Sequence, residues 1–119
     1  MGNFASTGGL LGAWETTATS CHSGVSTSPM GANTVVWFAH GSRYSAFQLS
    51  TGVISGRMNV WVQRSAPFRQ VDLERSRCAR FEVQQRPQPD GTLGADIELD
   101  CGAGDGGRVT ASIHAASCP

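Results

Sequence analysis

The chain has 119 residues, of which 39% are hydrophobic, and nine acidic residues balance nine basic ones. That length fits one globular domain with a real core, and the composition is not that of a disordered segment. Zero net charge excludes the strongly basic surface of a typical DNA, RNA or anionic-lipid binding domain, and no run approaches the ~20 apolar residues of a membrane helix.

The chain begins with a glycine-rich segment, residues 1–12, which we expect to be flexible and to precede a single domain over residues 13–119. The segment lacks the basic start and long apolar run of a signal peptide, so export requires that a leader has been removed. A rival interpretation is N-myristoylation, because Gly2 and Ser6 match its pattern. That interpretation implies a cytosolic protein with reduced cysteines.

The middle of the chain has the pattern of short strands and turns. Residues 34–40 are a continuous apolar run, which indicates a strand that is buried on both faces or lies at a crowded centre, and we expect Trp37 to lie in the core. Trp14 is expected to pack against either sheet. A turn at residues 40–42 leads to a strand at residues 44–49.

Glycines at 52 and 56 are interpreted as breaks before a strand over residues 57–63. This strand alternates, with one face formed by Met58, Val60 and Val62 and the other by Asn59, Trp61 and Gln63. Pro67 ends it, and residues 71–77 form at most one helical turn.

The last third predicts a three-stranded antiparallel meander over residues 78–85, 93–101 and 109–117. Turn residues at 86–91 and 102–107 connect the strands. Matching the inward-facing positions sets the register, which places Leu99 opposite Ala111, Ile97 opposite Ile113, Asp96 opposite His114, and Arg80 beside Glu98 or Asp100.

These elements predict an all-β fold, an antiparallel β-sandwich or jelly roll of about 6–8 short strands. Four cysteines, at positions 21, 78, 101 and 118, contain no C-x-x-C motif. Two disulfides are the favoured interpretation, which implies an oxidising compartment: secreted, periplasmic or at the cell surface. The alternative is a zinc site built from thiolates with His22, His40 or His114.

The disulfide pairing follows from the meander. Cys78 opens one strand and Cys101 ends its neighbour, whereas Cys118 lies at the opposite end of the sheet, about 30 Å from Cys101 along a straight strand. This favours Cys78–Cys101 with Cys21–Cys118. Because Cys78 and Cys101 differ in face parity, the pairing requires a bulge at residues 78–80.

Three further groups of residues were considered as functional sites, and for the first two a purely structural role is the better explanation. The segment Gly102–Gly107 resembles a phosphate loop, but a strand rather than a helix follows it, so a hairpin turn is expected. Asp96, Glu98 and Asp100 are expected to form a solvated acidic face rather than a metal site. A hydrolase using His22, His40 or His114 stays open, although no G-x-S-x-G motif occurs.

Trp61 is the one positive indication of a ligand site, because it alternates onto the same face as Asn59 and Gln63. A flat ring beside amide side chains is typical of a surface that stacks on sugars or anchors a protein partner. The opposing interpretation is that both faces are covered and Trp61 belongs to the core.

The cysteine and glycine layout, with Cys21-His22-Ser23-Gly24, Cys78 opening a strand, Gly94–Cys101-Gly102 and Val109–Cys118, resembles small four-cysteine secreted or lipoprotein β-domains of myxobacteria and related high-GC bacteria. The resemblance covers roughly residues 12–118. It implies a location in the cell envelope and no particular chemistry.

We therefore expect a non-catalytic structural or interaction domain, without cofactor or bound metal, that meets a protein or glycan at a surface. A carbohydrate-binding module using Trp61, Asn59 and Gln63 is the first alternative, and a small secreted hydrolase is the second. Nucleic acid is not expected as a partner, and homo-oligomer formation is left open.

Overall fold

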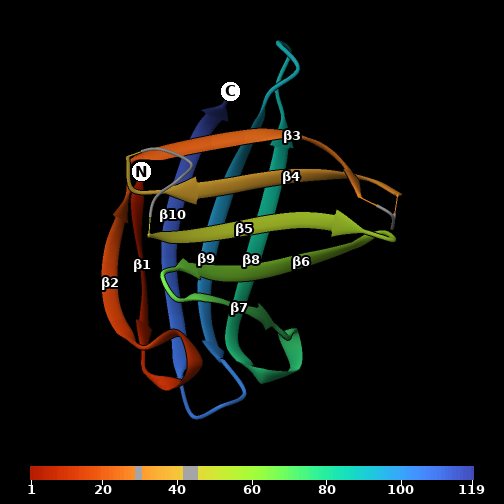
Figure 1. Cartoon of the computed structure of the whole chain (residues 1–119). Helices are drawn as coiled ribbons and strands as arrows, with labels where there is room; N and C mark the ends of the chain where they lie inside the picture. Colours follow the sequence, from red (N-terminus) through yellow and green to blue (C-terminus); the bar gives the residue numbers. More distant parts are fainter. Residues whose placement is uncertain (29–30, 42–45) are drawn as a thin grey trace.

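The structure of the protein, a computed structural model, describes residues 1–28, 31–41 and 46–119. Over these residues the chain forms ten β-strands in two five-stranded antiparallel sheets packed face to face. The strands of one sheet run across those of the other (Figure 1). The predicted antiparallel β-sandwich is confirmed, with more strands than the 6–8 expected.

One sheet, called here the terminal sheet, holds both chain ends and has the order β2-β1-β10-β9-β8. Its strands are β1 (Gly2–Thr7), β2 (Ala13–Ala18), β8 (Cys78–Pro87), β9 (Leu93–Gly102) and β10 (Arg108–Cys118). The other, the middle sheet, has the order β3-β4-β5-β6-β7. Its strands are β3 (Ser20–Ser28), β4 (Gly31–Ala39), β5 (Phe47–Ile54), β6 (Arg57–Ser65) and β7 (Phe68–Leu73). Two short 3-10 turns, η1 (Gly9–Leu11) and η2 (Arg75–Arg77), complete the fold.

The N-terminal segment is part of the sandwich, contrary to the expectation that residues 1–12 precede the domain as a flexible segment. Strand β1 lies between β2 and β10 and pairs with both. Its Phe4 side chain is 1% exposed. At Gly2 an added Cβ would lie 2.0 Å from the carbonyl oxygen of Ser112, so glycine permits the close approach to β10. The strand could not be recognised in the sequence, because two inward positions, Phe4 and Ser6, are too few to show the alternation of a β-strand.

The core lies between the two sheets and is built from alternate positions of their strands. Its most buried large side chains are Phe4, Leu11, Val36, Phe38, Leu49, Val60, Val62, Ile97, Val109 and Ile113. Trp14 sits at its margin, stacked on Phe47 with ring centroids 4.1 Å apart and edge-on to Phe4 at 5.7 Å. This aromatic cluster joins the first strands of the chain to the middle sheet.

Strand β4 corrects two expectations about the apolar run. Only one face of its described part enters the core, through Val36 and Phe38, while Trp37 on the opposite face is partly exposed. The run looks buried on both sides because its outer positions are also apolar. Trp37 is therefore not a core residue.

The β5–β6 hairpin turns at Ser55-Gly56, where both residues have positive φ, 52° and 78°. That conformation is the two-residue type I′ turn that matches the twist of paired strands. Gly56 is thus a break as expected, but Gly52 lies inside β5 opposite Asn59. The expected turn and strand over residues 40–49 include 42–45, which lie outside the described residues, and the expected helical turn reduces to η2.

The meander of the last third agrees with its predicted register. Leu99 lies opposite Ala111, Ile97 opposite Ile113, and Asp96 opposite His114. Arg80 is paired with Asp100 across the sheet and lies 3.9 Å from Glu98. The predicted bulge is present, since the register shifts between Cys78 and Arg80.

Both predicted disulfides are present: Cys21–Cys118 and Cys78–Cys101. The first fastens β3 of the middle sheet to the end of β10, and the second joins neighbouring strands of the terminal sheet. With all four cysteines oxidised, no thiolate is free for zinc. The reduced cysteines that accompany the myristoylation interpretation are also absent.

Candidate functional site

The outer face of the terminal sheet is covered by ion pairs. Asp96 lies 2.9 Å from Arg86, Asp100 lies 2.5 Å from Arg108, and Glu98 faces Arg80. The acidic residues are thus balanced by neighbouring strands, as expected of a solvated face. Exposed pairs of this kind contribute little to stability.

His114 lies at the centre of that face, between two carboxylates. Its Nδ1 is 3.0 Å from Asp96 and its Nε2 is 2.9 Å from Glu98. The nearby Ser112 hydroxyl donates to Glu98 at 2.8 Å, not to the imidazole. Because both ring nitrogens face carboxylates, neither is placed to take a proton from a nucleophile, and this cluster does not have the geometry of a hydrolase.

The hydrogen bonds to Asp96 and then to Glu98 hold the pKa of His114 above its ordinary value. A raised pKa in the folded state means that the protonated imidazole favours folding. That contribution is complete below the ordinary histidine pKa and is lost as pH rises through the folded-state value. We expect the His114 titration midpoint, followed by NMR of its ring protons, to lie above the ordinary value and to fall in Asp96→Asn. Asp100→Asn, which changes a carboxylate paired with Arg108, is the control. An unmoved midpoint in Asp96→Asn would contradict this assignment.

The other histidines and the glycine-rich loop make separate contacts within the described part of the chain. His40 Nδ1 lies 3.2 Å from the Thr17 carbonyl oxygen, and the His22 ring packs beside Trp37 with centroids 5.5 Å apart. The 102–107 loop is the expected hairpin turn between β9 and β10. Its Asp105 carboxylate accepts hydrogen bonds from the backbone N–H groups of Leu10 and Gly107, which ties the loop to η1.

The outer face of the middle sheet has a different character. One residue from each of its strands lies in a single transverse line, because each is the register partner of the next. We call this line the aromatic row; in the order β3 to β7 it consists of His22, Trp37, Ser50, Trp61 and Asp72. It brings together segments that are distant in the sequence.

Small residues form the floor beneath the tryptophans. Ser50, between Trp37 and Trp61, is only 3% exposed although it points outward. A Cβ added to Gly52 would lie 3.0 Å from Cη2 and 3.2 Å from Cζ3 of Trp61, so the indole leans over the backbone of β5. The absence of a side chain at Gly52 is what lets this ring lie down on the sheet.

Amide side chains flank the aromatic row along the strands. Asn59 is two residues before Trp61 and Gln63 two residues after it, on the same face, as the alternation predicted. Gln63 donates to Gln70 at 3.0 Å, and Gln70 donates to Asp72 at 3.4 Å. The structure therefore brings Trp61, Asn59 and Gln63 onto one polar face, with their amides partly ordered before any ligand arrives.

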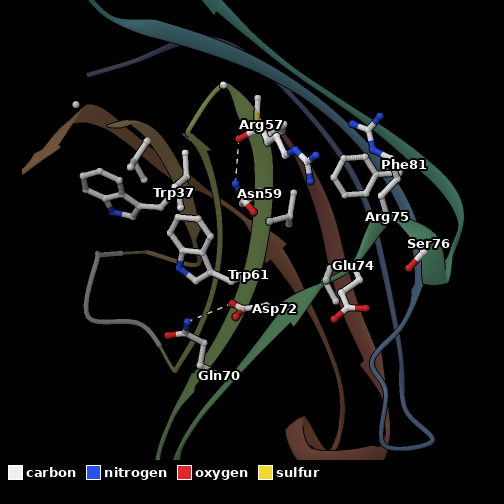
Figure 2. Close-up of a pocket in the computed structure, with 17 residues that line it drawn as sticks. Trp37, Arg57, Asn59, Trp61, Gln70, Asp72, Glu74, Arg75, Ser76 and Phe81 are labelled. Atoms are coloured by element: carbon white, nitrogen blue, oxygen red, sulfur yellow. Dashed lines mark hydrogen bonds between the residues drawn. The ribbon is translucent and has the colours of Figure 1, made fainter. Parts of the chain in front are cut away.

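The row borders a broad depression of about 1390 Å³. Figure 2 shows Trp37 and Trp61 on one side of it, with Arg57, Arg75 and Phe81 at the other end. Strand β7 pairs with β6 only from Val60 onward, so the depression continues past the uncovered start of β6 to the mouth between the sheets. There the Arg75 guanidinium lies 4.6 Å from the centroid of the Phe81 ring.

Gly52 offers a direct test of how the platform is supported. We expect Gly52→Ala to leave the fold intact, since this glycine has no positive φ, but to displace the Trp61 ring. The displacement should appear as a shift of the Trp61 indole NMR signal and as several-fold weaker ligand binding. Gly24→Ala is the matched control for the position of the ring, because a Cβ at Gly24, in the same line across the sheet, meets nothing within 4 Å although Gly24 also lines the depression. Equal behaviour of the two variants would contradict the supporting role of Gly52.

Sequence reasoning missed three parts of this site: Trp37, Ser50 and Gly52. The buried partners Val36 and Phe38 carry the alternation that would have placed Trp37 outside, but the apolar outer positions hid it. Ser50 and Gly52 gave no signal at all, because their role depends on which strands become neighbours.

No group of three or more His, Cys, Asp and Glu among the described residues is arranged to hold a metal ion. In the same part of the chain, no helix has the length and hydrophobicity to cross a membrane. Comparison with known proteins found no matching family model, curated protein or solved structure.

Proposed function

We propose that this protein is a non-catalytic carbohydrate-binding domain that uses the outer face of the middle sheet. The observation that carries the proposal is the Trp61 indole, which leans over Gly52 on a face lined by amides. Sugars present apolar C–H faces ringed by hydroxyl groups. A flat aromatic ring covers the first and amide groups hydrogen-bond the second.

Charge distribution supports an uncharged ligand. Three lines across β4, β5 and β6, at and beside the aromatic row, contain no charged side chain: Ala39, Gln48 and Gln63; Trp37, Ser50 and Trp61; Val35, Gly52 and Asn59. The outer face of the terminal sheet, in contrast, carries at least four arginine or histidine partners of acids. A neutral polyhydroxyl ligand fits the first face better than the second.

The two disulfides support a location in an oxidising compartment, where the protein would be secreted, periplasmic or on the cell surface. Glycans of cell walls and matrices are available in those places. In the proposed role, the domain would there attach its protein, or a larger assembly, to a polysaccharide.

The test is binding of the purified, oxidised protein to a glycan array and then to soluble oligosaccharides by calorimetry. We expect measurable binding that falls at least about tenfold in Trp61→Ala, since truncation of a central aromatic anchor commonly costs that much. Phe68→Ala is the control, because Phe68 is an exposed aromatic on the same face of β7 that lies outside both the aromatic row and the depression. Circular dichroism must show the same fold for all three proteins. No binding to any glycan at millimolar concentration would remove the proposal.

A further inference from the structure

The aromatic row has a direction and a spacing that restrict the ligand further, provided that the proposed glycan binding holds. Trp37 and Trp61 are separated by one strand, β5, and both are register partners of Ser50. Neighbouring strands lie 4.7–4.9 Å apart, so the two tryptophans are about 9.5 Å apart at the backbone, along a line perpendicular to the strands. Figure 2 shows both indoles on the same side of the sheet.

We infer that the ligand is an extended, uncharged, β-linked hexose chain that lies across the strands, with alternate sugar units stacked on Trp37 and Trp61. One unit of such a chain advances by roughly one strand spacing. Successive units turn opposite faces, so the same face recurs at every second unit. That repeat matches the backbone separation of Trp37 and Trp61, which are two strands apart.

Strand β5 places no large side chain in the row between the two tryptophans, since Ser50 stands there. Ser50 is 3% exposed, and the Trp61 indole already covers Gly52. The middle sugar unit therefore passes above β5 against the tryptophan rings and not against the backbone. Its hydroxyl groups face Gln63 on one side of the row and Asn59 on the other, in the adjacent lines across the sheet.

The ends of the row limit the length of chain that can be bound. From His22 to Asp72 the row crosses four strand spacings, about 19 Å, which corresponds to roughly four sugar units. His22 packs beside Trp37 at one end of the row, and the Asp72 carboxylate accepts a hydrogen bond from Gln70 at the other. Units beyond the fourth pass over the edge strands into solvent.

The inference is tested by calorimetry with cello- and chito-oligosaccharides from the disaccharide to the hexasaccharide, and with maltohexaose as a curved, α-linked probe. A disaccharide reaches one tryptophan, whereas a trisaccharide reaches both. We expect affinity to rise roughly tenfold or more from the disaccharide to the trisaccharide in one of the β-linked series, to rise further to the tetrasaccharide, and then to level off. Maltohexaose should bind at least tenfold more weakly than the matching hexasaccharide.

Trp37→Ala should remove the step between disaccharide and trisaccharide while it leaves disaccharide binding nearly unchanged. Trp37→Leu, which keeps an apolar side chain but no flat ring, should do the same and covers the case that the alanine variant does not fold. Phe68→Ala should retain the step. A flat length profile in the native protein, or equal binding of maltohexaose, overturns this inference and leaves the proposed function standing.

Absence of binding to every saccharide overturns both proposals together. A further alternative is that a second copy of the chain covers the outer face of the middle sheet. Sedimentation measurements test this alternative. A dimer that dissociates in Trp37→Ala or Trp61→Ala would overturn the glycan assignment, whereas a monomer in all proteins agrees with it.

Discussion

Replacement of Cys21 and Cys118 by alanine is expected to destabilise the protein by roughly 4–5 kcal/mol. The two cysteines are 97 residues apart in the sequence, so their bond removes a large part of the conformational freedom of the unfolded chain. Loop-closure arguments give about 4.7 kcal/mol for a loop of roughly 100 residues. The bond also holds the chain end on the middle sheet, where the Ser23 N–H donates to the Pro119 carbonyl at 2.9 Å.

The matched comparison is the double replacement of Cys78 and Cys101, which are 23 residues apart and join neighbouring strands. The same argument gives about 3.5 kcal/mol for that shorter loop. Urea unfolding of the native protein and both variants, under identical conditions, measures the difference. A smaller loss for the long-loop pair than for the short-loop pair would contradict the role assigned to the connection between sheets.

Phe4→Ala is expected to cost about 3–5 kcal/mol, a large fraction of the 5–15 kcal/mol that stabilises a typical domain. Phe4 is 1% exposed and lies edge-on to Trp14, with ring centroids 5.7 Å apart. Its removal leaves a cavity at the place where β1 meets the aromatic cluster.

Phe68→Ala, which removes the same group from a side chain that is 60% exposed, should change stability by no more than about 0.5 kcal/mol. Thermal and urea unfolding of both variants decide the matter. If Phe4→Ala loses no more stability than Phe68→Ala, the N-terminal segment is not part of the core. Residues 1–12 would then be the flexible segment that the sequence predicted.

The sequence predicted the local parts of this fold well, because strand alternation and turn chemistry are local properties. The last three strands and their register follow from parity and turn spacing. Both disulfides follow from the ends of the meander at which the cysteines lie, and the bulge at residues 78–80 follows from the conflict between the Cys78–Cys101 pairing and face parity. The β1 strand was missed because it lies between a local partner, β2, and a distant one, β10: Gly2 pairs with Ile113, which is 111 positions later in the sequence. A strand of six residues, with only Phe4 as a large apolar side chain, is too short to show a period in the sequence.

The candidate site also has a part that the sequence predicted and a part that it did not. Trp61, Asn59 and Gln63 are neighbours on one strand, so their common face was visible in the alternation of β6. Trp37, Ser50 and Gly52 join them through pairing between β4, β5 and β6, which no short sequence window contains. Only the assembled sheet turns one exposed tryptophan into a row with a direction and a repeat.

The central claim is that glycan binds on the outer face of the middle sheet, and the three tryptophan indole N–H signals in a ¹⁵N-correlated NMR spectrum test it most directly. Trp14 is an internal control, since its indole N–H donates to the Leu11 carbonyl at 2.9 Å beside the core. On titration with cellohexaose or chitohexaose, the account predicts that the Trp37 and Trp61 signals move while the Trp14 signal stays. Unchanged signals with both saccharides, or movement of Trp14 alone, would contradict it.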